Sequence, residues 1–308
     1  MNFTENTEEM RRKRSQRLID VIVLLLLSVV AIRAQTFPVG KQPWVTVFDG
    51  TNIWISNRGD NTVSKLSLSD GAILATYPVG SAPTGIVFDG ANIWAANLNS
   101  NNVTKLRASD GAWLGTFAVG TQPHELVFDG ANIWVTNGKS NSVTKLRASD
   151  GAVLGTYAVG TYPFGIAFDG ANIWVANFSS NDITKLRASD GSQLGTFAAG
   201  REPLEIKFDG QNVWIANHGS SNVTKLRPND GVPLGTYNIP VKAYGLAFDG
   251  PDIWVANDGA NCVTKMLLDG TVVGTYVVGT DPTSVAFDGT HIWVTNSVSS
   301  TVTKLPDD

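Results

Sequence analysis

The sequence predicts an all-β protein, a seven-bladed β-propeller with four-stranded antiparallel blades. Three observations predict this fold: a repeat of about 40 residues, several short strand-like segments in each repeat, and a last repeat that lacks its final strand. Phe-Asp-Gly recurs at a spacing of 40 residues five times and then 39, and a tryptophan follows each copy. The repeats begin at Phe48, Phe88, Phe128, Phe168, Phe208, Phe248 and Phe287.

Each repeat reads as a meander of four short strands. In the third copy we expect strands at Glu125–Phe128, Asn132–Thr136, Val143–Arg147 and Val153–Val159, all rich in β-branched or aromatic residues. Asp-Gly pairs join the first strand to the second and the third to the fourth, where tight turns need residues that tolerate positive φ. Helical repeats are excluded because no stretch shows an apolar period of 3.6 residues.

The beginning of the propeller region supplies the strand that the end lacks. The final copy stops at Lys304 and Leu305, after its third strand. Residues 35–40, Gln-Thr-Phe-Pro-Val-Gly, match the fourth-strand segment 115–120, Gly-Thr-Phe-Ala-Val-Gly. We therefore expect residues 35–39 to form the outer strand of the last blade, which removes an open sheet edge.

Two residues that recur in every copy are interpreted as structural. The tryptophan of the second strand faces the neighbouring blade, so we expect it to fill the core between blades. The asparagine that ends the same strand is expected to form turn hydrogen bonds rather than seven identical sites. These asparagines are Asn57, Asn97, Asn137, Asn177, Asn217, Asn257 and Asn296.

Residues 1–34 differ from the rest of the chain. A basic run at residues 11–17 precedes an apolar run at residues 18–32, which is the pattern of a secretory signal peptide. Because 15 apolar residues are fewer than the roughly 20 that span a bilayer, we favour a cleaved signal over a signal anchor. The expected domains are thus a signal segment at 1–34 and a propeller at 35–308, exported to the periplasm or secreted, with membrane attachment only if the segment is an uncleaved anchor.

Charge and composition limit the partners. Residues 35–308 hold 17 basic and 23 acidic residues, so their net charge is −6 and nucleic acid is not an expected partner. The single cysteine rules out an internal disulfide. We expect a monomer.

The shared unit, Phe-Asp-Gly-Ala-Asn-Ile-Trp-Val-Ala-Asn, then Val-Thr-Lys-Leu, then Leu-Gly-Thr-Tyr-Ala-Val-Gly, resembles the repeats of YncE-like (YVTN-repeat) propellers. It is more distantly similar to streptogramin (virginiamycin B) lyases. The first resemblance implies an exported binding module; the second implies a lyase that uses a His, a Glu and Mg²⁺ on one propeller face.

The lyase pattern is incomplete in this sequence. Pro123-His124-Glu125 matches the position of the lyase histidine, but Asn137 stands where the resemblance implies the glutamate. An amide cannot take the proton that an elimination removes. We therefore assign no catalytic residue, metal ligand or cofactor, and expect Mg²⁺ only if the lyase-like alternative holds.

Variation between copies concentrates on one face of the expected disc, at the loops before each first strand and after each second strand. The residue after the recurring proline and the residue after the recurring asparagine change from copy to copy. In two copies the second residue after the proline is a glutamate, Glu125 or Glu205. The candidate ligand-binding residues are Trp44, Arg58, His124, Glu125, Phe164, Phe178, Glu205, His218, Tyr244 and Asp258.

Two functions remain open at this point. The first is an exported scaffold that binds a protein, peptide or glycan at the variable loops. The alternative is a lyase or hydrolase that acts on the same face with His124 or His218 as acid or base. A structural interpretation stands beside both: the large side chains simply plug the central channel.

Overall fold

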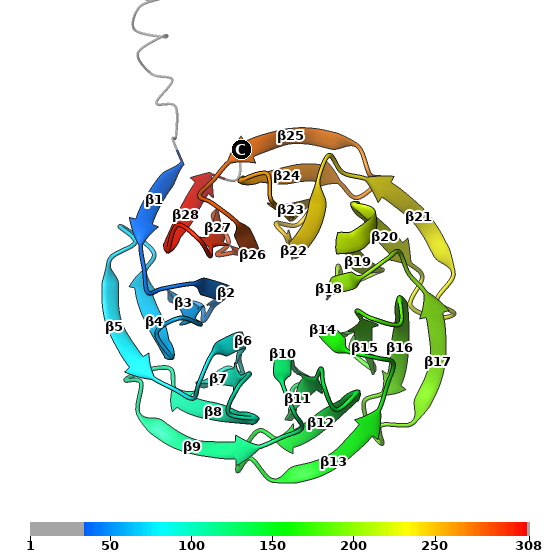
Figure 1. Cartoon of the computed structure of the whole chain (residues 1–308), viewed down its shortest axis with the longest axis horizontal. Coiled ribbons are helices and arrows are strands. Elements are labelled where there is room, and N and C mark those ends of the chain that lie inside the picture. The colour runs from blue at the N-terminus through cyan, green and yellow to red at the C-terminus, as the bar shows by residue number, and fades with distance from the viewer. Residues whose placement is uncertain (1–33, 307–308) are drawn as a thin grey trace, which may run out of the picture. The chain divides into compact units, whose positions relative to one another are not determined.

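The structure, a computed structural model, describes residues 34–306, and the predicted signal segment lies outside the described residues apart from Ala34. Seven four-stranded antiparallel sheets surround a central axis, and the chain runs round the ring once (Figure 1). The predicted seven-bladed propeller is confirmed. No helix within residues 34–306 has the length and apolar character needed to cross a bilayer.

In each of the first six blades, four consecutive strands lie side by side, the first next to the central channel and the fourth at the rim (Figure 1). These blades consist of β2 Pro43–Phe48, β3 Asn52–Asn57, β4 Thr62–Ser67 and β5 Ile73–Pro78; β6 Pro83–Phe88, β7 Asn92–Asn97, β8 Asn102–Arg107 and β9 Trp113–Ala118; β10 Pro123–Phe128, β11 Asn132–Asn137, β12 Ser142–Arg147 and β13 Val153–Ala158; β14 Pro163–Phe168, β15 Asn172–Asn177, β16 Asp182–Arg187 and β17 Gln193–Ala198; β18 Pro203–Phe208, β19 Val213–Asn217, β20 Asn222–Leu226 and β21 Pro233–Asn238; β22 Lys242–Phe248, β23 Asp252–Asp258, β24 Cys262–Leu267 and β25 Val272–Val277. A single-turn 3₁₀ helix, His218–Ser220, follows β19.

The seventh blade joins the two ends of the described chain. It contains β26 Pro282–Phe287, β27 His291–Asn296, β28 Thr301–Pro306 and, outermost, β1 Gln35–Pro38. β1 pairs antiparallel with β28, with Gln35 opposite Lys304 (Figure 1). Phe37 stacks on Trp293 with ring centroids 6.1 Å apart. The predicted closure by the N-terminal strand is therefore confirmed.

The recurring tryptophans form the core between blades, as predicted. All seven are fully buried, and Trp134 packs with Ile166, Ile173 and Val175 of the following blade. Burying one indole contributes about 5 kcal/mol of hydrophobic free energy before conformational entropy is subtracted. The indole N–H is satisfied within its own blade, because Trp134 Nε1 donates to Asp129 Oδ2 at 2.8 Å.

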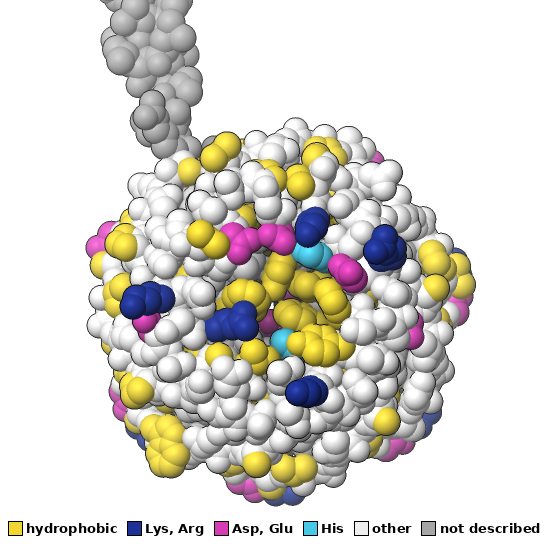
Figure 2. Space-filling view, viewed as in Figure 1, with side chains coloured by type: hydrophobic (Ala, Val, Ile, Leu, Met, Phe, Trp, Pro, Cys, Tyr) yellow, Lys and Arg dark blue, Asp and Glu magenta, His cyan; other side chains and the backbone are white. Residues whose placement is uncertain are grey.

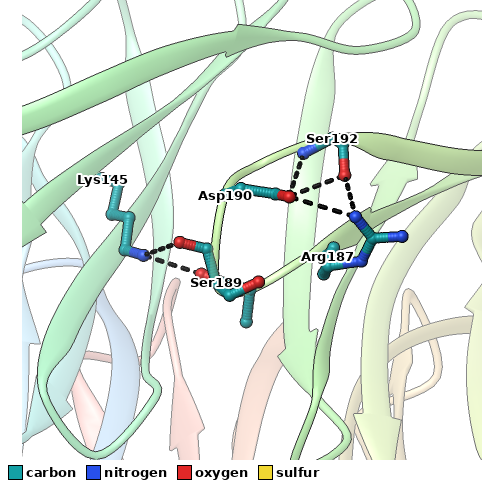
Figure 3. Close-up of polar contacts among 6 residues, drawn as sticks. Lys145, Arg187, Ser189, Asp190 and Ser192 are labelled. Carbon is teal, nitrogen blue, oxygen red and sulfur yellow. Dashed lines mark hydrogen bonds and ion pairs between the residues drawn. The ribbon is translucent and has the colours of Figure 1, made fainter.

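A lysine lies beside each tryptophan, and six of these lysines donate to a backbone carbonyl of the next blade. Lys145 Nζ lies 4.8 Å from the centre of the Trp134 ring and donates to the carbonyl of Ala188 at 2.7 Å. The same ammonium reaches the carbonyl of Ser189 in the next blade's turn (Figure 3). Lys304 repeats the contact across the closure, donating to Leu68 O at 2.6 Å.

The innermost strands carry an irregularity that decides where their side chains point. In β10 the register against β11 shifts between Pro123 and Leu126, and the other six blades show a shift at the matching place. A β-bulge of this kind interrupts the alternation of side chains and re-aims them. It lies where the propeller's most variable residues begin.

Candidate functional site

Four aromatic rings from four blades meet at the centre of the variable face. Trp44 of β2 and Phe164 of β14 both contact Tyr244 of β22 edge-on, at 5.8 and 6.4 Å between centroids. His124 of β10 stacks on Phe164 at 4.4 Å. We call Trp44, His124, Phe164 and Tyr244 the aromatic layer; Figure 2 shows hydrophobic side chains gathered round the centre of the disc with charged ones around them.

His124 is a packed member of this layer. It is 5% exposed, and neither ring nitrogen has a hydrogen-bond partner within the described part of the chain. Burial, together with the nearby Arg58 charge, lowers the pKa of His124 from 6.5 to about 4. Gly138 makes room for the ring, since a Cβ there would lie 2.7 Å from His124 Cδ2. His124 is thus a neutral imidazole held by packing near pH 7.

The asparagine at the position implied for the lyase glutamate takes part in the hydrogen bonds that connect the strands of its blade. Asn137 is fully buried and its amide donates to Ser142 Oγ at 3.2 Å and Thr144 Oγ1 at 2.9 Å. The same bridge from the second strand to the third recurs in the other blades, which confirms the turn hydrogen bonds expected for these asparagines. Within residues 34–306 no group of three His, Cys, Asp or Glu side chains is arranged to hold a metal ion.

A chain of polar side chains crosses the rim of the variable face from the fifth blade to the seventh. His218 Nε2 lies 2.9 Å from Asp258 Oδ2, and its Nδ1 lies 3.4 Å from Glu202 Oε2. Ser297 Oγ donates to Asp281 Oδ2 at 2.5 Å. We call Glu202, His218, Asp258, Asp281 and Ser297 the polar chain.

Two carboxyl groups of the polar chain, Asp258 and Asp281, interact with each other, and their pKa values shift in opposite directions. A hydrogen bond from the Asp281 side chain lowers the pKa of Asp258. Burial, followed by the hydrogen bond with Asp258, raises the pKa of Asp281. Opposite shifts of this kind are expected when two neighbouring carboxyl groups interact.

A recess of about 590 Å³ lies beside the aromatic layer, between the first and seventh blades. The guanidinium of Arg58 lies 4.6 Å from the centre of the Trp44 ring, and both line this recess with Asp281 and Ser297. On the other side of the layer, Tyr162 contacts His124 at 5.2 Å and Phe178 at 6.2 Å.

Glu125 and Glu205 occupy a different place from the one expected of them. They line a cavity of about 270 Å³ in the central channel, whose walls begin one residue beyond the aromatic layer along the inner strands. Lys207 Nζ lies 3.1 Å from Glu205 Oε1. Burial, and then repulsion by Glu205, raises the pKa of Glu125 well above its ordinary value.

The structure thus divides the predicted set into two groups. Eight residues lie at the variable face, in the aromatic layer or around it, while the two glutamates belong to the channel. Sequence reasoning missed Tyr162, Glu202, Asp281 and Lys207. The first three directly precede the recurring proline, two positions before the residues that were compared, and each has a positive φ between 51° and 61°.

Several solved structures share this fold. A virginiamycin B lyase from Staphylococcus aureus is 20% identical with a TM-score of 0.77, over 89% of this chain and 99% of that one. A streptogramin B lyase is 19% identical with a TM-score of 0.78, over 89% and 97% of the two chains. A hydrazine synthase chain from Kuenenia stuttgartiensis is 17% identical with a TM-score of 0.75, over 86% and 95%.

At these identities the likeness shows the fold alone. The sequence matches no model of a known protein family and no curated protein. The chain is therefore a seven-bladed propeller similar in structure to streptogramin B lyases, and its resemblance to YncE-like propellers stays a prediction.

Proposed function

We propose that the chain is an exported, YncE-like binding scaffold that holds a protein, peptide or glycan at its variable face. The observation that carries this proposal is the recess beside the aromatic layer, where Trp44, Arg58 and Asp281 offer a ring face, a cation and a carboxyl group together. Aromatic and charged groups at the mouth of a concave site supply both contact area and orientation for a bound chain.

The loops of the opposite face lack this variation, which supports a binding site on the variable face. There the loops are Asp-Gly turns that repeat from blade to blade, and their aspartates bind their own backbone. Asp129, for example, accepts from the N–H groups of Ala131 and Asn132. Groups already committed to a turn have little capacity left for a ligand.

The proposal is tested by screening residues 35–308 against peptide and glycan arrays, then measuring the hits by calorimetry. An Arg58→Ala variant should bind a hit about tenfold more weakly, because a partly desolvated charged contact is lost. Trp113→Ala is the matched control, since that ring is 65% exposed on the outer strand β9. Array hits whose affinity is the same in both variants would place binding elsewhere and reject the proposal.

One observation favours the lyase or hydrolase as a second candidate. The polar chain places two interacting carboxyl groups, Asp258 and Asp281, beside His218, which contacts Asp258, and carboxyl and imidazole groups are the usual general acids and bases. Incubation with a cyclic depsipeptide lactone, with and without Mg²⁺, should then give a linear product by mass spectrometry. Loss of that product in His218→Gln would support this candidate; no product under either condition would exclude it for this substrate.

A further inference from the structure

The channel cavity is distinct from the variable face, and most of the residues that line it are apolar. Its walls come from the innermost strands, and they extend to Phe168 and Phe208, the last residues of β14 and β18 before their Asp-Gly turns. At about 270 Å³ it lies just below the usual range of small-molecule pockets, so it suits a compact ligand. The apolar wall residues are Val45, Val47, Ile86, Val87, Leu126, Val127, Ile166, Ala167, Leu246 and Val285.

The charged groups of this cavity do not balance. Glu205 is paired with Lys207 at 3.1 Å, which leaves Glu125 as the remaining acid. Glu125 is only 7% exposed, and its carboxyl group has no hydrogen-bond donor among residues 34–306. Burial, followed by repulsion from Glu205, raises the pKa of this carboxyl group, and the Lys207 charge offsets that rise only in part.

A second polar group in the same cavity is also unpartnered. Thr46 of β2 is 5% exposed, and its Oγ1 has no hydrogen-bond partner within the described chain. It comes from the first blade, whereas Glu125 comes from the third. Two blades thus present unsatisfied oxygen atoms to one small apolar cavity.

Glycines on the inner strands make room for this arrangement. A Cβ at Gly85 would lie 2.8 Å from Glu125 Oε2, and a Cβ at Gly165 would lie 2.4 Å from the carbonyl oxygen of Leu204. The Glu125 carboxyl group therefore lies over a residue without a side chain. Gly85 thus leaves room for the Glu125 carboxyl group beside the inner strand.

We propose that the channel cavity binds a small aliphatic primary amine as its ammonium ion, with the charged head beside Glu125 and Thr46 and the hydrocarbon part against the valine and isoleucine walls. An ammonium group has three donors and one positive charge, which match the Thr46 hydroxyl and the Glu125 carboxyl group and would stabilise the carboxylate form of Glu125. A hydrated divalent cation fits less well, because it needs six or more oxygen ligands and gains nothing from apolar walls.

The test is calorimetric titration of residues 35–308 with n-butylamine hydrochloride and, separately, with n-butanol, which has the same chain and no charge. Butylammonium should bind and butanol should bind at least about tenfold more weakly, because a charge-assisted hydrogen bond to a buried carboxylate is lost. Equal binding of the two compounds, or no binding of the amine, would overturn the proposal.

Two near-isosteric variants locate the site. Glu125→Gln should weaken amine binding by about tenfold or more, and Thr46→Val should weaken it several-fold without loss of folding, since its hydroxyl has no partner. Glu202→Gln, a change at the rim of the variable face, is the matched control and should leave amine affinity unchanged. Unchanged affinity in Glu125→Gln would remove the site from the channel.

The inference goes beyond the proposed function and fails separately from it. Arg58→Ala should alter binding of array hits and leave amine binding intact. Glu125→Gln should do the reverse, because the two residues line different cavities.

Discussion

Burial shifts the pKa values of single side chains near the propeller axis. His124 is neutral because burial and Arg58 disfavour its charged form, and Glu125 resists ionisation because burial and Glu205 do. The two residues are adjacent in sequence, yet one packs in the aromatic layer and the other lines the channel cavity. Each makes the stability of the protein depend on pH in its own direction.

The histidine makes the protein less stable in acid. The pKa of His124 is about 4 in the folded state and 6.5 in the unfolded chain, so the unfolded chain binds the extra proton between these values. Stability should fall by about 3 kcal/mol from this group as pH drops from 6.5 to 4. His124→Leu should flatten this part of a plot of unfolding free energy against pH, measured with urea.

Phe164→Leu serves as the control for that measurement. It removes the ring stacked on His124 but adds and removes no titratable group, so its offset from the native protein should change little with pH. A His124→Leu profile that runs parallel to the native one would contradict the expected burial of the imidazole.

The glutamate acts in the opposite pH range. Because the folded state raises the pKa of Glu125, the native protein loses stability as pH rises from the unfolded value of 4.5 through the folded value. Glu125→Gln should therefore have a higher Tm than the native protein at pH 8.5, and this advantage should vanish near pH 4. Thr46→Val, in the same cavity but without a titratable group, should differ from the native protein equally at both pH values.

At the scale of strands and blades, neighbouring sheets are held together by a contact set that recurs round the ring. The tryptophan of one blade packs on the isoleucines and valines of its neighbour, and the lysine above it donates to a carbonyl in the neighbour's turn. An exposed ion pair, Arg147 with Asp150, lies on the same turn-bearing face but is half exposed on both sides. Both contacts use a cationic side chain, but Lys145 is buried and Arg147 is half exposed to solvent.

Their energies should differ accordingly. Lys145→Leu should cost about 2 kcal/mol in urea unfolding, because it leaves a carbonyl without its donor and removes the cation from the Trp134 ring. Arg147→Gln, the matched surface change, should cost less than about 0.5 kcal/mol. Equal losses in the two variants would mean that the buried lysine does not tie the blades together.

For the whole molecule, the strand that closes the seventh blade is the strongest test of the architecture. A chain that starts at residue 40 lacks β1, so β28 has an open edge and Trp293 loses its contact with Phe37. We expect this truncated protein to melt at a lower temperature and to self-associate, as measured by scanning calorimetry and sedimentation.

A permuted chain distinguishes strand pairing from chain closure. Residues 34–39 are moved behind residue 306 through a short glycine turn, which is possible because Gln35 lies opposite Lys304. The permuted protein should regain a monomeric fold, since β1 again covers β28. If the truncated protein were as stable and monomeric as the native one, β1 would not be needed for closure.

Sequence reasoning went furthest where the causes are local. The Phe-Asp-Gly and Trp repeat predicted the blade number, and the strands of the third blade lie within two residues of the predicted ends. The match between residues 35–40 and 115–120 predicted the closure. Turn chemistry and β-branched runs act over a few residues, so a single repeat contains enough information to define its blade.

By itself, then, the sequence determined the ring, its order and its closure, and it indicated the variable face. The tertiary structure alone decided that Glu125 lies in the channel while His124 packs above it, and that the polar chain joins residues from three blades. The physical reason is the bulge in each inner strand: it breaks the two-residue alternation, so the direction of a side chain there cannot be read from its position. Residues 40 or more positions apart become neighbours only when their blades pack into the ring.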